Sequence, residues 1–262
     1  SPTTAFATVS VPFCISSEVR VNARVFLAGP FAGTQMSDAL RASGLIPTLE
    51  PYTAAGWSQV EGGGETIGTG VLNTTGVNAI TDWVRLELRD PATPGTVVAT
   101  RQALVQRDGD IVSATDGTSP VGFDAAPGQY HIAVRHRNHL GCMTATPVSL
   151  TSSATGLDFT AAATATYGTT ARNDAGGVMM LWPGDVSNNG SVQYTGSGND
   201  RDLVLQAIGG IVPTNTLANV YDVRDVNLDG SVIYTGGSND RDVILQTIGG
   251  TVPTNVKAQQ LP

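Results

Sequence analysis

One segment near the C-terminus carries oxygen-bearing side chains with the types and spacing of cation ligands. Asp225, Asn227 and Asp229 occupy positions 1, 3 and 5 of a loop, with Gly230 at position 6 and Ser231 at position 7. Alternate residues of a tightly turning loop point inward, glycine permits the sharp bend, and position 7 supplies its backbone carbonyl oxygen. Hard oxygen ligands of this kind favour calcium over softer metals.

The same pattern occurs once more upstream. In the first copy, Asp185, Ser187, Asn189 and Ser191 hold the corresponding ligand positions. Clusters of Asn, Asp and Gly also form turns without an ion, which is the alternative interpretation. Two copies in register favour a tandem calcium-binding repeat. Because the first copy has fewer carboxylates to offset the charge of the ion, we expect its site to be the weaker one.

The carboxylate that closes each loop is displaced from its usual place. In both copies, position 12 falls on a glycine, which has no side-chain oxygen, so an insertion must precede the closing residue. We expect Asp200 and Asp240 to close the loops, with Asp202 and Asp242 as the alternatives. The preferred pair enters the following helix as position 12 of an EF-hand does.

Each loop leads into a short apolar segment, 203–208 or 243–248, that ends at a pair of glycines. Asn199 or Asp200 in the first copy and Asn239 or Asp240 in the second stand where helix caps are expected, and the glycines stand where helices end. Helices of this length are unstable alone. We therefore expect the two helices to pack against each other.

Residues 183 to 256, with their paired loops and helices, resemble a dockerin-type repeat, a tandem calcium module whose loop is similar to an EF-hand without its entering helix. The phrase Tyr-Thr-Gly-Ser-Gly-Asn-Asp-Arg-Asp at 194–202 is similar to C-terminal modules of secreted, hemagglutinin-like cell-surface proteins of Bacteroidota-type bacteria. The resemblance implies a calcium-binding α module that docks onto a partner protein at the cell surface.

The larger N-terminal part shows the alternation of apolar and polar residues that is typical of strands. In the segment 19–27, Val19, Val21, Ala23 and Val25 share one face. The other predicted strands are 82–88, 96–106, 129–135 and 146–150, separated by turns rich in Gly, Asp and Pro. This spacing predicts a β-sandwich.

The predicted fold is therefore mainly β, with a β-sandwich over residues 1–178 and a small dockerin-like module over 179–262. Pro-Gly-Gln-Tyr at 127–130 is similar to one edge of prealbumin-like and other cell-surface domains, so we expect an Ig-like or prealbumin-like sandwich. Strand 82–88 is expected to bury one face. Trp83 lies on the opposite face, where it is either exposed or packed under a loop, and residues 53–70 are predicted to form a long surface loop.

The three histidines, His131, His136 and His139, are the only residues that suggest transition-metal or acid–base chemistry. No HExxH pattern, nucleophile elbow or phosphate-binding glycine loop accompanies them. We therefore interpret this region as a strand followed by a polar turn, and we expect a protein that is not an enzyme.

Charge and composition narrow the choice of partners. The net charge of −8 argues against nucleic acid as a partner, and no apolar run approaches the roughly 20 residues of a membrane span. The absence of a charged leader at Ser1 predicts a processed, extracellular product. In an oxidising compartment Cys14 and Cys142 are candidates for a disulfide, although two separate thiols are an equal alternative.

We expect an extracellular structural or adhesive protein, for example a self-assembling filament subunit, whose two calcium sites stiffen the C-terminal repeat. Strand addition by residues 3–12 to a neighbouring subunit would build a head-to-tail homopolymer, and an ordinary first strand is the alternative. The other candidate functions are a docking module for a cell-surface partner protein and a carbohydrate-binding domain that uses Trp57 or Trp83.

Overall fold

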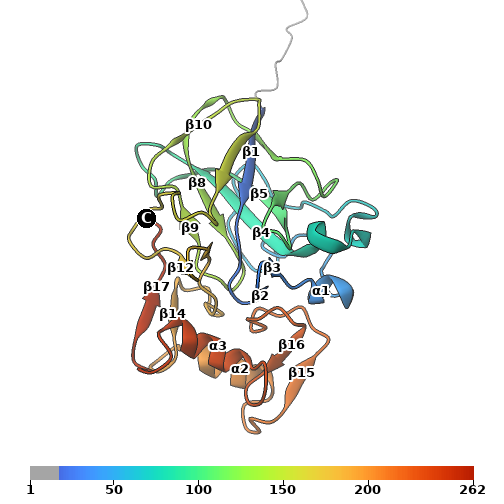
Figure 1. Ribbon diagram of the computed structural model, residues 1–262, viewed down its shortest axis with the longest axis vertical. Coiled ribbons are helices and arrows are strands. Elements are labelled where there is room, and N and C mark those ends of the chain that lie inside the picture. Colours follow the sequence, from blue (N-terminus) through green and yellow to red (C-terminus); the bar gives the residue numbers. More distant parts are fainter. Residues whose placement is uncertain (1–17) are drawn as a thin grey trace, which may run out of the picture.

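The computed structural model describes residues 18–262 and shows a mainly β protein with open sheets (Figure 1). The candidate disulfide partner Cys14 and the strand-exchange segment 3–12 lie outside the described residues. Cys142 is buried, and burial raises the pKa of its thiol to about 12. Within residues 18–262, no helix has the length and apolar composition needed to cross a bilayer.

Two sheets make up the N-terminal part. The smaller has the order β11 (Thr155–Asp158), β1 (Glu18–Arg24), β7 (Val121–Asp124). The larger has the order β10 (Val148–Leu150), β8 (Gly128–Arg135), β4 (Ile80–Arg89), β5 (Val97–Gln106), β6 (Ile111–Val112), and β9 (Cys142–Met143) also pairs with β8. The predicted strands are thus confirmed, with small differences at their ends.

One hydrophobic core lies between these sheets. The alternation predicted for the first strand is confirmed, since Val19, Val21, Ala23 and Val25 are at most 1% exposed. They belong to the same cluster of buried residues as Val84, Leu86 and Leu88 of β4. Period-2 alternation therefore places apolar residues of both sheets in one common core.

The prediction that β4 buries only one face was wrong, because every residue of this strand is buried. The segment 45–66 covers the second face. Trp83 is fully buried there, and its Nε1 donates a hydrogen bond to the carbonyl of Pro47 at 2.9 Å. Tyr52, also fully buried, donates its hydroxyl to the carbonyl of Trp83 at 3.0 Å. The cover continues into the predicted surface loop 53–70, where the carbonyl of Ser58 accepts a hydrogen bond from Arg85 of β4 at 2.6 Å.

Short elements connect the sheets. They are β2 (Phe31–Ala32), β3 (Gln35–Met36), α1 (Ala39–Ala42), the 3-10 helices η1 (Val71–Asn73) and η2 (Gly76–Asn78), and the hairpin β12 (Asn173–Asp174) with β13 (Met179–Met180). The helix α1 is a single turn.

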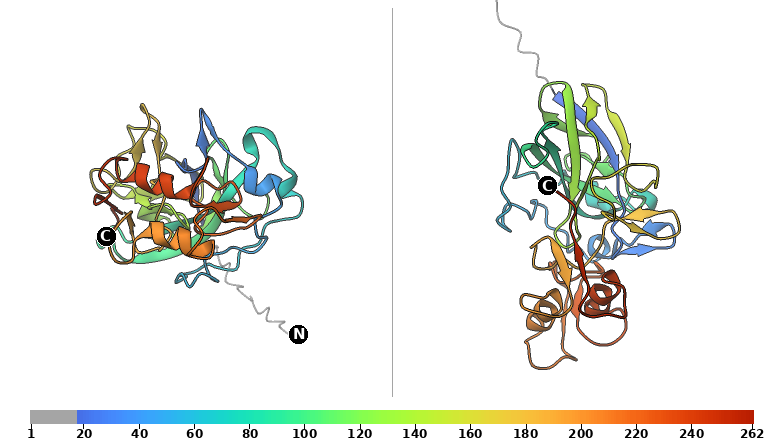
Figure 2. Two further views of the ribbon diagram at one scale, coloured as in Figure 1. Left: turned by 90° about the horizontal axis from the view of Figure 1, so that it is seen from below. Right: turned by 90° about the vertical axis from the view of Figure 1, so that its left-hand side faces the viewer.

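The C-terminal repeats form a separate layer below the sheets, in orange and red in Figure 1. Their elements are β14 (Ser191–Gln193), α2 (Asp200–Ala207), β15 (Thr216–Ala218), β16 (Ser231–Ile233), α3 (Asp240–Thr247) and β17 (Val256–Ala258). The view from below in Figure 2 shows α2 and α3 side by side. Val204 and Ile244 are fully buried in one cluster, as the predicted packing of the two helices requires.

The two repeats also pair their strands with each other within the chain. The loop strand of the first repeat, β14, pairs with the tail of the second, β17, while β16 of the second repeat pairs with the tail of the first, β15. Each repeat therefore completes the other, which gives a structural reason for the duplication. Most buried apolar residues up to Leu181 belong to the core of the sheets, and most from Val186 onward belong to a second core, but Leu228 lies in the first core and Leu140 in the second.

Candidate calcium loops and their junction with the sheets

The second loop is closed by two buried aspartates. The carboxylate of Asp225 accepts hydrogen bonds from the backbone N–H groups of Asp229 at 3.1 Å and Gly230 at 2.8 Å. The carboxylate of Asp240 accepts from Val226 at 2.6 Å and Ile233 at 2.8 Å. The first and last acidic residues of the loop are both 0% exposed. By accepting backbone N–H groups of the loop, the two carboxylates hold the loop in a closed conformation.

The first loop repeats this arrangement. Asp185 accepts from the N–H groups of Asn189 and Gly190 at 3.1 and 3.0 Å, and Asp200 accepts from Ser187 and Gln193 at 3.1 and 2.8 Å. A carboxylate oxygen has more than one lone pair, so accepting an N–H bond leaves capacity for a cation. The two loops thus hold their first and closing carboxylates in the same way.

The remaining predicted ligands differ in how they are held. Ser231 and Ser191 donate their N–H groups to Asp229 and Asn189 at 2.9 and 2.8 Å, which fixes the middle of each loop. Asn227 accepts the N–H of Asp229 at 3.0 Å. Its amide nitrogen also bonds the carbonyl of Ser238 at 2.7 Å, across the inserted segment.

The alternative closing residues, Asp202 and Asp242, have another task. Asn199 is the N-cap of α2 and accepts the N–H of Asp202 at 2.9 Å, while its amide nitrogen donates back to the Asp202 carboxylate at 2.8 Å. Arg201 bonds the other oxygen of that carboxylate. Asn239, Arg241 and Asp242 repeat these contacts in α3. The loops therefore incorporate Asp200 and Asp240, the preferred pair, whereas Asp202 and Asp242 stabilise the starts of the helices.

The carboxylates of the loops are electrostatically unfavourable in the absence of a cation. Burial and the neighbouring charge of Asp200 raise the pKa of Asp185 to about 6. Burial raises the pKa of Asp225 to about 7. It raises that of Asp240 to about 8, with the charges of Asp225 and Asp229 contributing in the same direction. A bound cation would reverse these shifts, because it favours the ionised form.

Across the part of the chain that the structure describes, no three His, Cys, Asp or Glu side chains gather closely enough to form a metal site by themselves. The donor set of each loop is mixed. Besides its aspartates, it contains an amide or hydroxyl at position 3, Asn189 or Asp229 at position 5, and a serine at position 7. These donors are all oxygens, the chemistry that calcium prefers.

The second loop is joined to the sheets by buried polar contacts. Asn138 donates its amide to the carbonyls of Val223 at 2.9 Å and Asp225 at 2.7 Å. Arg137 donates to the carbonyl of Asp222, and its guanidinium carbon lies 4.3 Å from the ring centroid of Tyr221. The backbone carbonyl of Asp225, the first predicted ligand, is thus bonded by Asn138, which lies in the segment after β8.

Asp82 of β4 anchors this junction from the side of the sheet. Its carboxylate accepts from Arg137 at 2.9 Å, from the Tyr221 hydroxyl at 2.7 Å, and lies 3.1 Å from Nε2 of His136. Burial alone would raise the pKa of Asp82, but the charge of Arg137 and the bonds from His136 and Tyr221 lower it to about 2. Asp82 is therefore ionised and is the counter-charge of the buried Arg137.

Two of the three histidines, His136 and His139, belong to this junction, whereas His131 lies in β8 beside the carbonyl of Thr144. His136 and His139 lie in the predicted polar turn after the strand, and this turn is buried. Nδ1 of His136 lies 3.0 Å from Nδ1 of His139, and Nε2 of His139 accepts the N–H of Gly29 at 3.1 Å. Burial lowers the pKa of both imidazoles. Neutral rings satisfy these contacts if His139 carries its proton on Nδ1 and His136 on Nε2. This burial was not predictable from the local sequence, because Val223 and Asp225, which cover the turn, lie 85 and 87 residues from Asn138 along the chain.

The backbones of the two layers approach closely at Gly29. A Cβ atom at this position would lie 2.0 Å from the carbonyl oxygen of Val226, so any side chain would force the layers apart. Leu228, at position 4 of the second loop, is 1% exposed and packs in the core of the sheets. The second loop is therefore a part of the junction and not a free surface loop.

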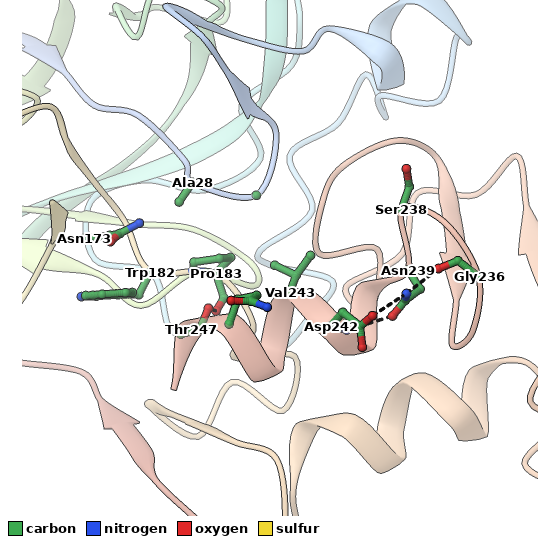
Figure 3. Close-up of a pocket in the computed structure, with 12 residues that line it drawn as sticks. Ala28, Asn173, Trp182, Pro183, Gly236, Ser238, Asn239, Asp242, Val243 and Thr247 are labelled. Carbon is green, nitrogen blue, oxygen red and sulfur yellow. Dashed lines mark hydrogen bonds between the residues drawn. The ribbon is translucent and has the colours of Figure 1, made fainter. Parts of the chain in front are cut away.

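A surface pocket of about 500 Å³ lies where α3 meets the sheets (Figure 3). Trp182 lines it, and the ammonium of Lys257 lies 4.1 Å from the ring centroid. Asn239 and Asp242 border the other end and bond each other across the start of α3. The polar groups at that end are already engaged in capping the helix.

Comparison with known proteins adds no family assignment: no family model matches the chain, and no similar protein is found among curated sequences or solved structures.

Proposed function

We propose that this chain is a non-enzymatic extracellular structural or adhesive protein in which two calcium ions stabilise the C-terminal repeats. The observation that carries the proposal is the repeated loop geometry, in which a buried first aspartate and a buried closing aspartate bind the same set of backbone N–H groups in both copies. The loops occur twice, and each holds oxygen donors with carboxylates that repel each other. A bound cation would offset this repulsion, whereas an ordinary turn has no such need.

In this proposal Asp225, Asn227, Asp229, Ser231 and Asp240 hold the ion of the second loop. The first loop uses Asp185, Ser187, Asn189, Ser191 and Asp200. Calcium, when bound, supplies positive charge that offsets the repulsion between the aspartates. Extracellular calcium modules have dissociation constants of about 10⁻⁴ to 10⁻³ M, so modest sites of this kind suit a secreted protein.

We propose that these ions stabilise the fold, because the second loop is part of the contact between the repeats and the sheets. Asn138 links the second loop to the polypeptide after β8, and the strand pairs β14–β17 and β15–β16 link the repeats to each other. An ion that fixes the second loop therefore also fixes Asp222, Val223 and Asp225 against the sheets. We further propose that the two sheets form an Ig-like or prealbumin-like sandwich and that the repeats form a dockerin-like module.

The apolar residues after the helices favour a second candidate, a module that docks onto a partner protein. Ile211 is 88% exposed, and Val212 and Val252 are each 45% exposed at corresponding places in the two repeats. Size-exclusion chromatography with light scattering separates the candidates. A calcium-saturated protein that assembles alone supports a filament subunit, and loss of assembly after deletion of residues 1–12 would support strand exchange. A strictly monomeric protein supports docking.

Titration calorimetry of chelator-treated protein tests the calcium proposal directly. We expect about two calcium ions per chain, with the tighter binding lost in Asp225→Asn and the weaker in Asp185→Asn. Magnesium is expected to bind more weakly, because it demands near-ideal octahedral geometry. Absence of calcium binding at millimolar concentration would refute the proposal.

A further inference from the structure

A second pocket, of about 330 Å³, lies between the covered face of the larger sheet and the first calcium loop. Trp57 and Ser58 of the covering segment, Arg85 of β4, Arg135 of β8 and Asn188 of the loop contribute to its walls. Its volume is at the low end of the range for small-molecule sites, which suits a ligand of the size of one sugar residue.

The side chains at this pocket carry an excess of positive charge. Among the described residues that line the pocket, Glu87 of β4 is the single carboxylate. Arg89, just outside the lining, bonds one of its oxygens at 2.9 and 2.6 Å. Nε of Arg85 lies 3.0 Å from the other oxygen. Arg135 is a third guanidinium beside the same group. One carboxylate thus faces three arginines, in a chain whose net charge is −8.

Of the arginines around Glu87, Arg135 has the most unused hydrogen-bonding capacity, since both terminal nitrogens of Arg85 are already bonded to the covering segment. Among residues 18–262, its only hydrogen bond is a long one, 3.4 Å from Nη1 to Glu87, and its buried Nε has no partner. Its side chain is 28% exposed, against 4% for that of Arg85. A guanidinium with unused parallel donors is suited to bidentate binding of a carboxylate.

Trp57 holds Arg135 in place. The guanidinium carbon lies 4.3 Å from the centroid of the indole, and the edge of that ring packs against Tyr52 with 4.9 Å between centroids. Stacking on a fixed aromatic ring orients the guanidinium before a ligand arrives. Trp57 is therefore a positioning residue in this pocket, which differs from the aromatic sugar platform considered from the sequence.

Neutral polar groups complete the pocket. Asn188 stands at position 4 of the first loop with a positive φ of 55°, and its counterpart in the second loop, Leu228, has a φ of 58°. Leu228 fills the core of the sheets, whereas Asn188 borders the pocket. The Asn188 amide and the Ser58 hydroxyl can bond ligand hydroxyl groups, which a simple carboxylate lacks.

We propose that this pocket binds an acidic sugar residue of the hexuronate type, with its carboxylate on Arg135 and its hydroxyl groups toward Ser58 and Asn188. This inference is independent of the calcium proposal. A glycan ligand of this kind would suit a protein at a cell surface.

Titration calorimetry with glucuronate, in constant calcium, tests the assignment. We expect Arg135→Gln to weaken glucuronate binding about tenfold or more, because it removes a charge-assisted bidentate contact. Arg135→Lys, which keeps the charge without the fork, should lie between. Arg20→Gln, an equal change of charge at a half-exposed residue of β1, should leave binding unchanged.

Two ligand controls complete the experiment. Glucose, which lacks the carboxylate, should bind at least tenfold more weakly than glucuronate, and glutamate, which lacks the sugar hydroxyls, should do the same. Glucuronate binding that is absent, or equal in Arg135→Gln and wild type, would overturn the proposal. Equal binding of glutamate and glucuronate would overturn the assignment to a sugar.

Discussion

At the scale of single residues, the behaviour of the loops follows from burial of their aspartates. Asp240 has no exposure and accepts backbone N–H bonds, yet burial still raises its pKa to about 8. Asp242, two residues on, is held by Asn239 and Arg241 at the surface, and these bonds lower its pKa. Two neighbouring aspartates of the same helix therefore have opposite electrostatic environments.

The raised pKa values predict how the stability of the calcium-free protein depends on pH. Folded Asp225 and Asp240 hold protons that the unfolded chain, with pKa values near 3.9, releases. The free energy of unfolding should therefore fall as the pH rises from about 4 to 8. Asp82, whose pKa is lowered to about 2, has the opposite effect: it lowers the free energy of unfolding as the pH falls from about 4 to 2.

Urea unfolding at pH 5 and pH 8, with chelator and with calcium, measures this dependence. The stabilisation by calcium should be larger at pH 8, because at pH 5 the ion must displace protons from the aspartates. A chelator-treated protein that is more stable at pH 8 than at pH 5 would contradict the electrostatic account of the loops.

Asp240→Asn and Asp242→Asn form a matched pair that separates the closing ligand from the helix cap. Asp240→Asn should abolish most of the calcium-dependent stabilisation of the second loop, which amounts to about 1.4 kcal/mol at ten times Kd, the ratio that millimolar calcium gives for a site with a Kd of about 10⁻⁴ M. Asp242→Asn should retain it and cost about 1 kcal/mol with or without calcium, since it weakens a helix start. Thermal unfolding with and without calcium measures both effects, and equal calcium dependence in the two variants would contradict the assignment.

At the scale of elements, local sequence patterns predicted the features that depend on the element itself or on its partner helix in the other repeat. The alternation in β1 and the capped starts of α2 and α3 were predictable. The burial of both faces of β4 and the strand pairing between repeats were not. They depend on the covering segment 45–66 and on the tails β15 and β17, and the periodicity within a single strand does not predict which distant segment will pack or pair with it.

The packing of α2 on α3 predicts a large effect for Ile244 and a small one for Ile211. Ile244 is fully buried between the helices, so Ile244→Ala should lower the free energy of unfolding by about 2 to 5 kcal/mol. Ile211 is 88% exposed, and Ile211→Ala should change it by no more than about 0.5 kcal/mol. Urea unfolding in calcium compares the variants, and similar losses would argue against the packing of the helices.

At the scale of the whole molecule, the repeats and the sheets form one body through a buried polar junction. The C-terminal tail runs back along the sheets (Figure 2), where Gln259 accepts the N–H of Gly141 at 2.8 Å. Asp82, Arg137 and Tyr221 come from three distant parts of the sequence. No motif marked them beforehand, because each is ordinary in its local context and acquires its role only when the layers meet.

Asn138→Ala should uncouple the layers. It leaves the carbonyls of Val223 and Asp225 without their buried donor, at a cost of about 1 to 3 kcal/mol. We expect the repeats to unfold in a separate, earlier thermal transition that still shifts with calcium. Gln260→Ala, which removes exposed contacts of the tail with Thr170, serves as the control and should keep a single transition. A single unchanged transition in Asn138→Ala would show that the junction does not depend on this amide.

The most direct test of the central claim is calorimetric unfolding in millimolar calcium and then in chelator, with light scattering of the same samples. The account predicts that chelation lowers the melting temperature of the C-terminal repeats first, because calcium binds only their folded form. Dispersal of assemblies in the same step would tie the ions to assembly as well. A melting profile that is identical in calcium and chelator would contradict the account and leave the loops as turns without an ion.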